Sequence, residues 1–274
     1  MPIITVSRRA YSRGKEIAEK SADILGYECV GRKVLRLASS EYGIPEEKLY
    51  KATHEAPSLL GMTPKTRKKY IAYVKAAFAE YMLKDNIVYH GPAGELLIQG
   101  VSHLLRVRIN AELEDRIALK MKRDGVSEKE ARHGIVDIDE QHAKLMRWVY
   151  GRDDTDASLY DLVINVSQIG VEKAVDIITG TVKLKKFQPM TYSKKLLKNI
   201  ELSCRVTAHL IDLDPDVRVR SENGSVHVFT KATGKAKTKN VEIIKERTSN
   251  LPDVKDVDVH MSEDLFERIA GEMR

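Results

Sequence analysis

The chain has 274 residues, 42% hydrophobic and 31% charged, a composition typical of a folded globular protein and unlike a disordered chain or a collagen-like repeat. Its 46 lysines and arginines exceed its 40 acidic residues, and this mild excess suits nucleotide phosphates, nucleic acid or anionic lipid, or simply an ordinary mixed-charge surface. No apolar run approaches the roughly 18–20 residues of a membrane-spanning helix, and the short apolar start comes before Arg8 and Arg9, unlike a signal peptide, so we expect a cytoplasmic protein.

The first two thirds of the chain alternate between strand and helix patterns. Ile3–Val6 is a short apolar run typical of a buried parallel strand, Ser7–Gly14 is a polar and basic loop, and Lys15–Leu25 is an amphipathic helix that Gly26 ends. This alternation indicates an α/β fold with a parallel sheet. Further helices are expected over 32–41, after Pro45, and over 63–84, 93–99, 112–122, 127–150 and 171–184, and further strands over 86–91, 105–109 and 162–165.

The pattern changes after Phe187-Gln188-Pro189. A helix over 193–211, a hairpin with its turn at Asn223-Gly224, a helix over 241–248 and a strand over 254–260 predict a small α+β module. We therefore expect an α/β domain over 1–188, an α+β domain over 192–261 and a terminal helix over 262–274.

A loop between a strand and a helix can hold phosphates, because the amide groups at the helix start point outward and the helix dipole favours anions. Gly14 and Lys15 match the last glycine and the lysine of the P-loop pattern G-x-x-x-x-G-K-[ST]. Arg9 replaces the first glycine, however, and Glu16 replaces the hydroxyl residue. From the spacing alone, an ordinary loop followed by a helix is favoured over a phosphate site.

Several separate segments, in the right order, give the chain up to about residue 185 a resemblance to the cytidylate kinase-like family. The closest stretch, almost residue for residue, consists of Ser158–Asn165 with the preceding Tyr150-Gly151, Asp153 and Asp156. The other matching segments are Ser7–Ala18 (S-R-x-x-G-S-G-G-x-x-I-A in the family), Gly26-Tyr27 with Arg32–Leu35 (G-Y-x-x-x-D-R-x-L-L), Glu55–Ser58 (E-K-A-P-S) and Leu113–Ile117.

The resemblance implies a P-loop NTPase-like fold, a five-stranded parallel sheet with helices on both faces. It also implies phosphoryl transfer from ATP, with Mg²⁺, to a nucleoside monophosphate. Lys15 and Arg147 are the catalytic candidates if the chain is active. The residues expected to bind nucleotide or phosphate are Ser7, Arg8, Ser12, Arg13, Gly14, Lys15 and Arg147.

The chain departs from the family pattern in several parts of that site. Phosphoryl transfer depends on positive charge around the migrating group, and one arginine changes its rate by orders of magnitude. The joint departures favour a protein without kinase activity. The departing residues are Tyr11 and Arg13 in place of loop glycines, Gly31 in place of an aspartate, Pro92 and His142 in place of arginines, and Asp137 in place of a lysine; to these is added Glu16 in place of the hydroxyl of the general P-loop pattern.

Residues 192–261 resemble a BON domain, a small fold associated with phospholipid or protein partners. The resemblance rests on Asp214–Val217, Glu222–Gly224, Val226 with Val228, and Leu251–Val257. A basic run follows the hairpin, and a solvated loop is favoured there over a lipid or nucleic-acid surface. The lysines of that run are Lys231, Lys235, Lys237 and Lys239.

Two functions from different classes remain. The first is a nucleotide- or phosphate-binding protein with a degenerate phosphotransfer site and a regulatory or partner-binding role through the BON-like domain. The alternative is an active CMP-type kinase that uses ATP through an altered P-loop. We expect no metal site, because the two cysteines, Cys29 and Cys204, lie far apart and the histidines show no i, i+4 pairing.

Overall fold

The computed structural model describes residues 2–58, 61–230 and 237–261. The chain forms two compact units, one made of Met1–Met62 and Lys84–Lys194, the other of Thr63–Leu83 and Lys195–Arg274. Within the described residues, no helix is both long and apolar enough to cross a membrane. The expected terminal helix over 262–274 and Lys231 and Lys235 of the basic run lie outside the described residues.

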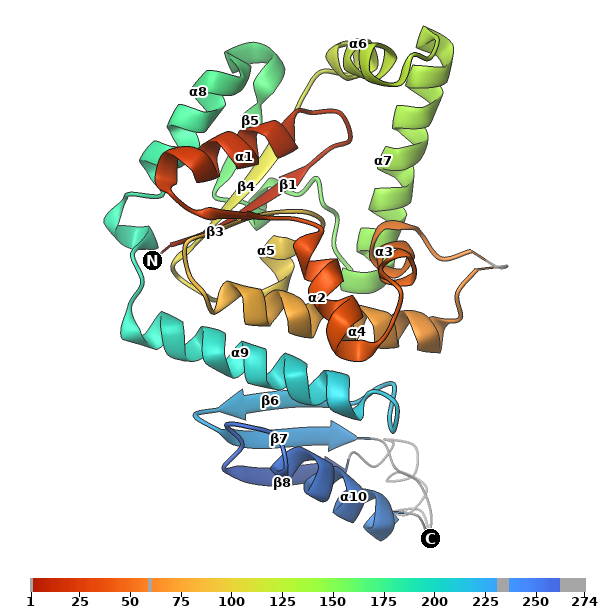
Figure 1. The fold of residues 1–274 in the computed structure, drawn as a ribbon, viewed down its shortest axis with the longest axis vertical. Coiled ribbons are helices and arrows are strands. Elements are labelled where there is room, and N and C mark those ends of the chain that lie inside the picture. The colour runs from red at the N-terminus through yellow and green to blue at the C-terminus, as the bar shows by residue number, and fades with distance from the viewer. Residues whose placement is uncertain (1, 59–60, 231–236, 262–274) are drawn as a thin grey trace, which may run out of the picture. The chain divides into compact units, whose positions relative to one another are not determined.

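The first unit is built on a five-stranded parallel sheet (Figure 1). Its strands stand in the order β2-β3-β1-β4-β5, so β1 is central and the carboxyl ends of all five strands share one edge. An α/β fold with a parallel sheet was predicted, and the structure confirms it. The strands are β1 (Ile3–Arg8), β2 (Glu28–Val30), β3 (Ile87–His90), β4 (Leu104–Asn110) and β5 (Leu162–Asn165).

Seven α-helices surround this sheet among the described residues of the first unit. Ser127 and Glu130 form the expected capping box, each side chain bonding the other residue's backbone amide, and a helix starts there. The helices are α1 (Gly14–Leu25), α2 (Lys33–Tyr42), α3 (Glu46–His54), α5 (Gly94–Leu97), α6 (Leu113–Asp124), α7 (Glu128–Tyr150) and α8 (Val166–Thr181), with 3₁₀ turns at Ala157–Leu159 and Lys185–Phe187.

Strand alternation separates the apolar core from the polar edge. Val6 lies beside Val107 in register, and both are fully buried in the core that α1 and α8 complete. Ser7 and Arg108, the next pair in the same register, lie on the opposite side of the pleat and are also buried. A buried polar pair near the carboxyl ends of the central strands marks the edge at which open α/β sheets bind ligands.

Two elements differ from the sequence-based expectation. The strand β2 was not predicted, because three residues are too short to show a period. The helix α8 starts at Val166 rather than at residue 171. It has an additional first turn, which a kink at Gly170, with φ of 75°, separates from the rest of the helix. Asn165 caps this early turn by accepting a hydrogen bond from the backbone amide of Ser167.

The second unit contains a three-stranded sheet in the order β6-β7-β8, with β6 and β7 antiparallel and β7 and β8 parallel. The predicted succession of helix, hairpin, helix and strand is present after residue 190. This unit also includes the helix of 63–83, so the two units interleave in sequence, and the expected boundary between 188 and 192 stays a prediction. The elements are α4 (Pro64–Met82), α9 (Thr191–Leu210), β6 (Arg218–Glu222), β7 (Ser225–Thr230), α10 (Lys237–Ser249) and β8 (Asp256–Met261).

Candidate functional site

The loop between β1 and α1 keeps a glycine-type backbone without glycines. Tyr11 and Arg13 have φ of 58° and 59°, in the left-handed region. Each costs about 1–2 kcal/mol relative to a right-handed conformation. Both residues lie just before Gly14, the first residue of α1. The surrounding structure therefore holds the loop backbone in a conformation that these two residues disfavour.

The Tyr11 side chain is held against α6. Its hydroxyl donates to the carboxylate of Asp124 and accepts from Lys120 Nζ at 3.2 Å. The cations of Lys120 and Arg123 lie 4.9 Å and 4.8 Å from the ring centroid. The hydrogen bonds from Lys120 and Tyr11 lower the pKa of Asp124 to about 2. The ring is therefore fixed by contacts with the helix after β4.

The cations at the start of α1 are paired with carboxylates of the same helix. The Arg13 guanidinium donates to both Glu16 carboxylate oxygens, at 2.8 and 2.9 Å. Hydrogen bonds from Arg13 and Lys20 hold the pKa of Glu16 below its usual value. Lys15 Nζ lies 3.5 Å from Glu19 Oε1, and its side chain is 62% exposed. The structure thus brings Arg13 and Lys15 to the helix start but neutralises both.

Arg8 at the end of β1 is the cation of the loop whose environment differs. Its side chain packs on Gly14, where a Cβ atom would lie 2.7 Å from the Arg8 Cβ. Arg8 Nε is buried and has no hydrogen-bond partner among the described residues. Burial lowers the pKa of this guanidinium. A buried donor without an acceptor is costly, and an anion would supply the acceptor.

His90 at the end of β3 shows the same feature. In β3, which pairs with β1, His90 is in register with Val6, two residues before Arg8. Burial, together with the charge of Arg8, lowers the pKa of His90 to about 4, and its Nδ1 atom is buried without a partner among the described residues. A Cβ atom on Gly31 would lie 2.5 Å from the His90 ring. The ring therefore fills the space that the missing aspartate side chain would need.

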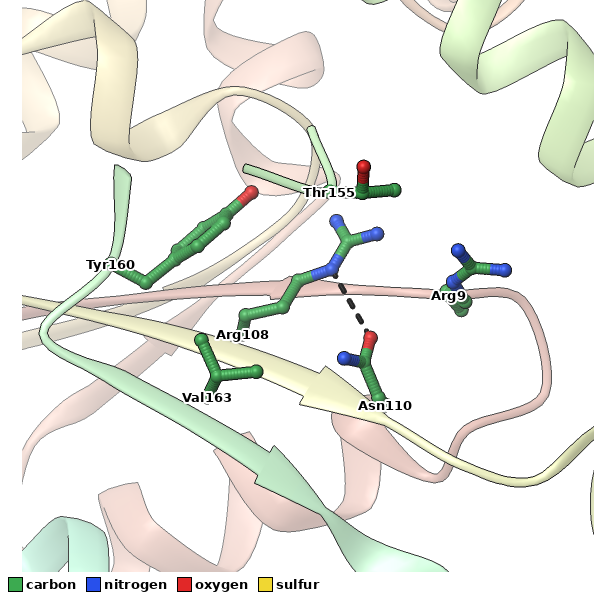
Figure 2. A pocket seen from close by; sticks show the side chains of 6 residues that line it. All are labelled: Arg9, Arg108, Asn110, Thr155, Tyr160 and Val163. Carbon is green, nitrogen blue, oxygen red and sulfur yellow. Dashed lines mark hydrogen bonds between the residues drawn. The ribbon is translucent and has the colours of Figure 1, made fainter. Parts of the chain in front are cut away.

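A small pocket lies at the carboxyl ends of β4 and β5 (Figure 2). Arg108 stands in its wall, 4% exposed, donating to Ser7 Oγ at 2.8 Å and Asn110 Oδ1 at 3.4 Å. An ion pair of 2.9 Å with Asp154 balances its charge. The hydroxyl of Ser7, a predicted site residue, thus accepts a hydrogen bond from Arg108 below the carboxyl edge of the sheet. The lining residues are Arg9, Arg108, Asn110, Thr155, Tyr160 and Val163.

Two further predicted residues have structural contacts. Ser12 is 1% exposed and donates its hydroxyl to the Arg9 carbonyl at 2.8 Å, which holds the loop closed. Arg147 Nη2 lies 3.3 Å from Asp153, on an exposed part of α7. Ser12 therefore stabilises the loop, whereas Arg147 is exposed and paired with Asp153.

A buried arginine attaches the loop to α6 and α7. Arg116 is 2% exposed, donates to the Ala10 carbonyl at 2.7 Å and contacts Asp139 at 2.8 Å. Asp139 also takes Arg9 Nη1 at 3.3 Å. This carboxylate therefore holds one buried and one half-exposed guanidinium, and it fixes the loop to the helices that follow β4.

Sequence reasoning missed the roles of Glu16, His90 and Gly31. Glu16 was noted only as a missing hydroxyl, whereas the structure makes it the partner of Arg13. Gly31 stands where the family has an aspartate, and His90 begins the segment His90-Gly91-Pro92, where the family reads V-G-R. That joint change was the available signal that the His90 ring fills the space beside Gly31.

The comparisons with known proteins match the N-terminal part of the chain. The model of the Cytidylate kinase-like family matches residues 3–168. The Cytidylate kinase of Methanopyrus kandleri is 27% identical over 184 residues, 66% of this chain and 92% of that protein. The Cytidylate kinase of Pyrococcus horikoshii is 26% identical over 181 residues, 66% of this chain and 88% of that protein.

Among solved structures, an uncharacterized protein from Eubacterium ventriosum has a TM-score of 0.51 at 18% identity, covering 66% of this chain and 97% of that one. This likeness concerns the fold alone. The family model, in contrast, spans more than half of the sequence and includes the loop, the strand ends and α7. The chain belongs to the cytidylate kinase-like family.

Proposed function

We propose that this protein binds a nucleotide or phosphate at the carboxyl edge of its parallel sheet but carries a degenerate phosphotransfer site, and that it acts in the cytoplasm through binding rather than catalysis. The observation that carries the proposal is the bidentate pair between Arg13 and Glu16 in the first turn of α1. Arg13 stands where the family pattern has a glycine, and Glu16 stands where the general P-loop pattern has a hydroxyl residue.

Glu16 weakens this end of the helix as a phosphate site. The exposed amides and the dipole of a helix start attract one anion, and here the chain supplies that anion itself. The carboxylate also occupies Arg13 and, at 3.4 Å, Lys20. A phosphate entering the loop must displace these contacts and approach a negative charge.

The same residues do not fit the Mg²⁺ and ATP arrangement that the family implies. Mg²⁺ is held by one or two oxygen ligands together with phosphate oxygens and waters. The hydroxyl that would serve this purpose is replaced by Glu16, whose oxygens are both bonded to Arg13. Lys15, which would reach the outer phosphates, is turned to Glu19.

Anion binding is supported by Arg8 and His90 instead. Both end neighbouring strands, and each has a buried nitrogen without a partner among the described residues. The Arg8 guanidinium is a cationic donor at this edge and favours a phosphate, since charge-assisted hydrogen bonds are about twice as strong as neutral ones. The His90 ring, whose pKa is lowered to about 4, is neutral near pH 7 and can add a neutral N–H donor. The strained backbone of Tyr11 and Arg13 is consistent with a loop shape kept for a ligand.

Calorimetric titration with ATP, with and without Mg²⁺, tests this proposal. We expect weak binding that Mg²⁺ does not strengthen. Glu16→Gln should tighten ATP binding about three- to tenfold, because it removes a charge at the helix start and frees Arg13. Asp23→Asn, an exposed carboxylate in the last turn of α1, is the matched control and should change binding less.

Arg8→Gln should weaken ATP binding, with unchanged circular dichroism showing that the variant is folded. Binding that Mg²⁺ strengthens strongly, or equal effects of the Glu16 and Asp23 replacements, would contradict a site degraded by Glu16.

The alternative is an active nucleoside monophosphate kinase that uses ATP. The observation in its favour is that the similar curated proteins are named cytidylate kinases. Against it stand Gly31 with the His90 ring above it, and His142, whose pKa burial lowers, so that a neutral ring replaces a permanent cation in α7. Phosphorylation of CMP separates the two functions.

For the second unit we propose a BON-like regulatory role, with a protein or anionic phospholipid partner. Its support is the succession α9, β6, β7, α10 and β8, which follows the predicted order. Sedimentation of the full chain with vesicles containing phosphatidylserine, compared with neutral vesicles, tests the lipid form of this role. Equal sedimentation with both would exclude it.

A further inference from the structure

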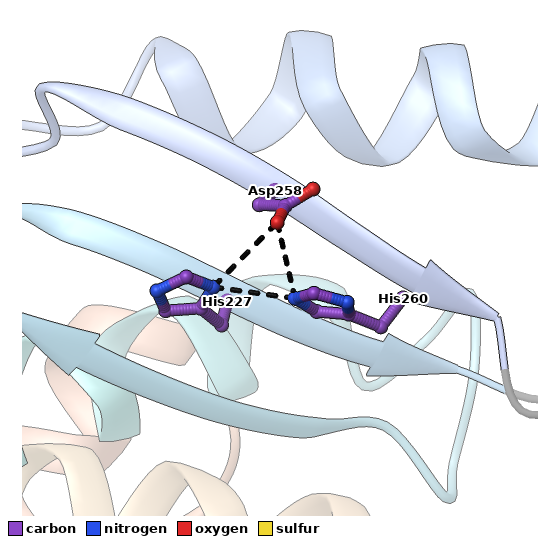
Figure 3. A group of neighbouring side chains, drawn as sticks. All are labelled: His227, Asp258 and His260. Atoms are coloured by element: carbon purple, nitrogen blue, oxygen red, sulfur yellow. Dashed lines mark hydrogen bonds and ion pairs between the residues drawn. The ribbon is translucent and has the colours of Figure 1, made fainter.

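Two histidines and an aspartate converge on one face of the three-stranded sheet of the second unit (Figure 3). His227 lies on β7, and Asp258 and His260 lie on β8. His227 Nδ1 is 3.2 Å from His260 Nε2 and 3.8 Å from Asp258 Oδ2, and His260 Nε2 is 3.2 Å from that same oxygen. All three side chains are partly exposed.

The strand pairing creates this cluster. His227 is in register with Asp258 on the neighbouring parallel strand, and His260 follows Asp258 by two residues, so the three lie on one side of the pleat. The intervening positions hold apolar side chains, of which Val226 and Val228 are fully buried. The valine core thus fixes which face the polar residues occupy.

The spacing of the three ligand atoms matches a metal centre. Ligands about 2.0–2.1 Å from a tetrahedral zinc ion stand about 3.3–3.4 Å from one another. The observed separations lie on either side of this value, and the largest needs only a small side-chain adjustment. The His260 ring also stacks on Phe229, with centroids 4.8 Å apart, which limits its rotation.

Hydrogen bonds among the three side chains cannot pair all of their facing nitrogen and oxygen atoms. His260 Nε2 faces both His227 Nδ1 and the Asp258 carboxylate, and a single N–H on that nitrogen can point to one of them only. A cation between the three atoms accepts a lone pair from each. We propose that His227, Asp258 and His260 bind a divalent transition metal, with zinc as the preferred ion.

Three protein ligands leave a coordination position open toward solvent. Such an open position takes water or a donor group from another molecule. Arg220, exposed and in register with His227 on β6, places a positive charge beside the site. We therefore infer a site of moderate affinity that exchanges its metal, rather than a closed structural centre that holds the fold together.

Titration of the full chain with ZnCl₂ by calorimetry, and with Co²⁺ by visible absorption, tests the proposal. Imidazole and carboxylate ligands in a four-coordinate site give Co²⁺ strong visible bands. His260→Gln and Asp258→Asn, which keep side-chain size, should each weaken zinc binding about tenfold or more and remove these bands. His133→Ala, an exposed histidine on α7 of the first unit, is the matched control and should leave both unchanged.

A stoichiometric zinc event that is lost in both strand variants and kept in the control supports the site. The absence of zinc binding, or binding that all three variants weaken equally, overturns it. His227→Ala is an additional replacement of a ligand. The circular dichroism spectrum of each variant distinguishes the loss of a metal ligand from the loss of the fold.

Discussion

Replacing Arg13 tests whether the loop before α1 stores backbone strain. Arg13 has φ 59° and ψ 11°. Both Arg13→Ala and Arg13→Gly remove the ion pair with Glu16. Arg13→Ala keeps a Cβ atom in this left-handed conformation, and Arg13→Gly removes it. The comparison between the two variants therefore isolates the backbone contribution.

The expected difference follows from two opposing effects. Relief of the left-handed conformation is worth about 1–2 kcal/mol, and the greater freedom of glycine in the unfolded chain returns about 0.4–1 kcal/mol. The exposed pair with Glu16 contributes about 0.3–0.5 kcal/mol and is lost in both variants. Arg13→Gly should thus be about 1 kcal/mol more stable than Arg13→Ala.

Unfolding in guanidinium chloride, followed by fluorescence, measures this difference. The sequence has one tryptophan, Trp148, and it lies on α7 in the same unit as the loop. Tyr11→Gly should instead lower the stability of the folded protein, because the loss of the contacts with Asp124 and Lys120 outweighs the relief of backbone strain. An Arg13→Ala variant as stable as Arg13→Gly, or more so, would refute the reasoning.

The remaining predictions use the same fluorescence. Burial lowers the pKa of His54 and His90 to about 4, so stability should be full above about pH 6.5 and fall toward pH 4, by at most about 3 kcal/mol per histidine; a flat profile over this range would contradict it. Asp139→Ala should cost about 3–5 kcal/mol because it leaves the buried Arg116 uncompensated, and a loss below 1 kcal/mol would contradict that role. Gly31→Ala should destabilise by about 1–3 kcal/mol through its clash with the His90 ring, and His90→Ala in the same chain should recover most of the loss; strictly additive effects would refute the contact.

The sheet of the first unit was predictable because its strands carry strong apolar patterns. Val6 and Val107 lie in apolar runs that are typical of buried strands. The capping box at Ser127 indicates a helix start from the local residues alone. β2 was missed since three residues show no period. The grouping of α4 with the second unit is a matter of tertiary packing, which no local pattern contains.

The candidate site was predictable in its location and less so in its contacts. The strand, loop and helix pattern placed Arg13 and Lys15 at the start of α1, where they are found. Their pairing with Glu16 and Glu19 depends on rotamers, which spacing does not determine. The cluster of His227 with Asp258 and His260 depends on a parallel pairing across about 30 residues, so a search for helical i, i+4 pairs could not detect it.

The phosphorylation of CMP by ATP and Mg²⁺ is the measurement that tests the central claim most directly. A coupled assay that detects ADP, run on the full chain over a range of CMP concentrations, should show no turnover above the background without CMP. Glu16→Ser, which supplies the hydroxyl of the general P-loop pattern, should not by itself restore activity, because Gly31 and Pro92 still lack the acceptor groups. Turnover by the unmodified chain near the usual kinase range of about 1–100 per second would contradict a degenerate phosphotransfer site.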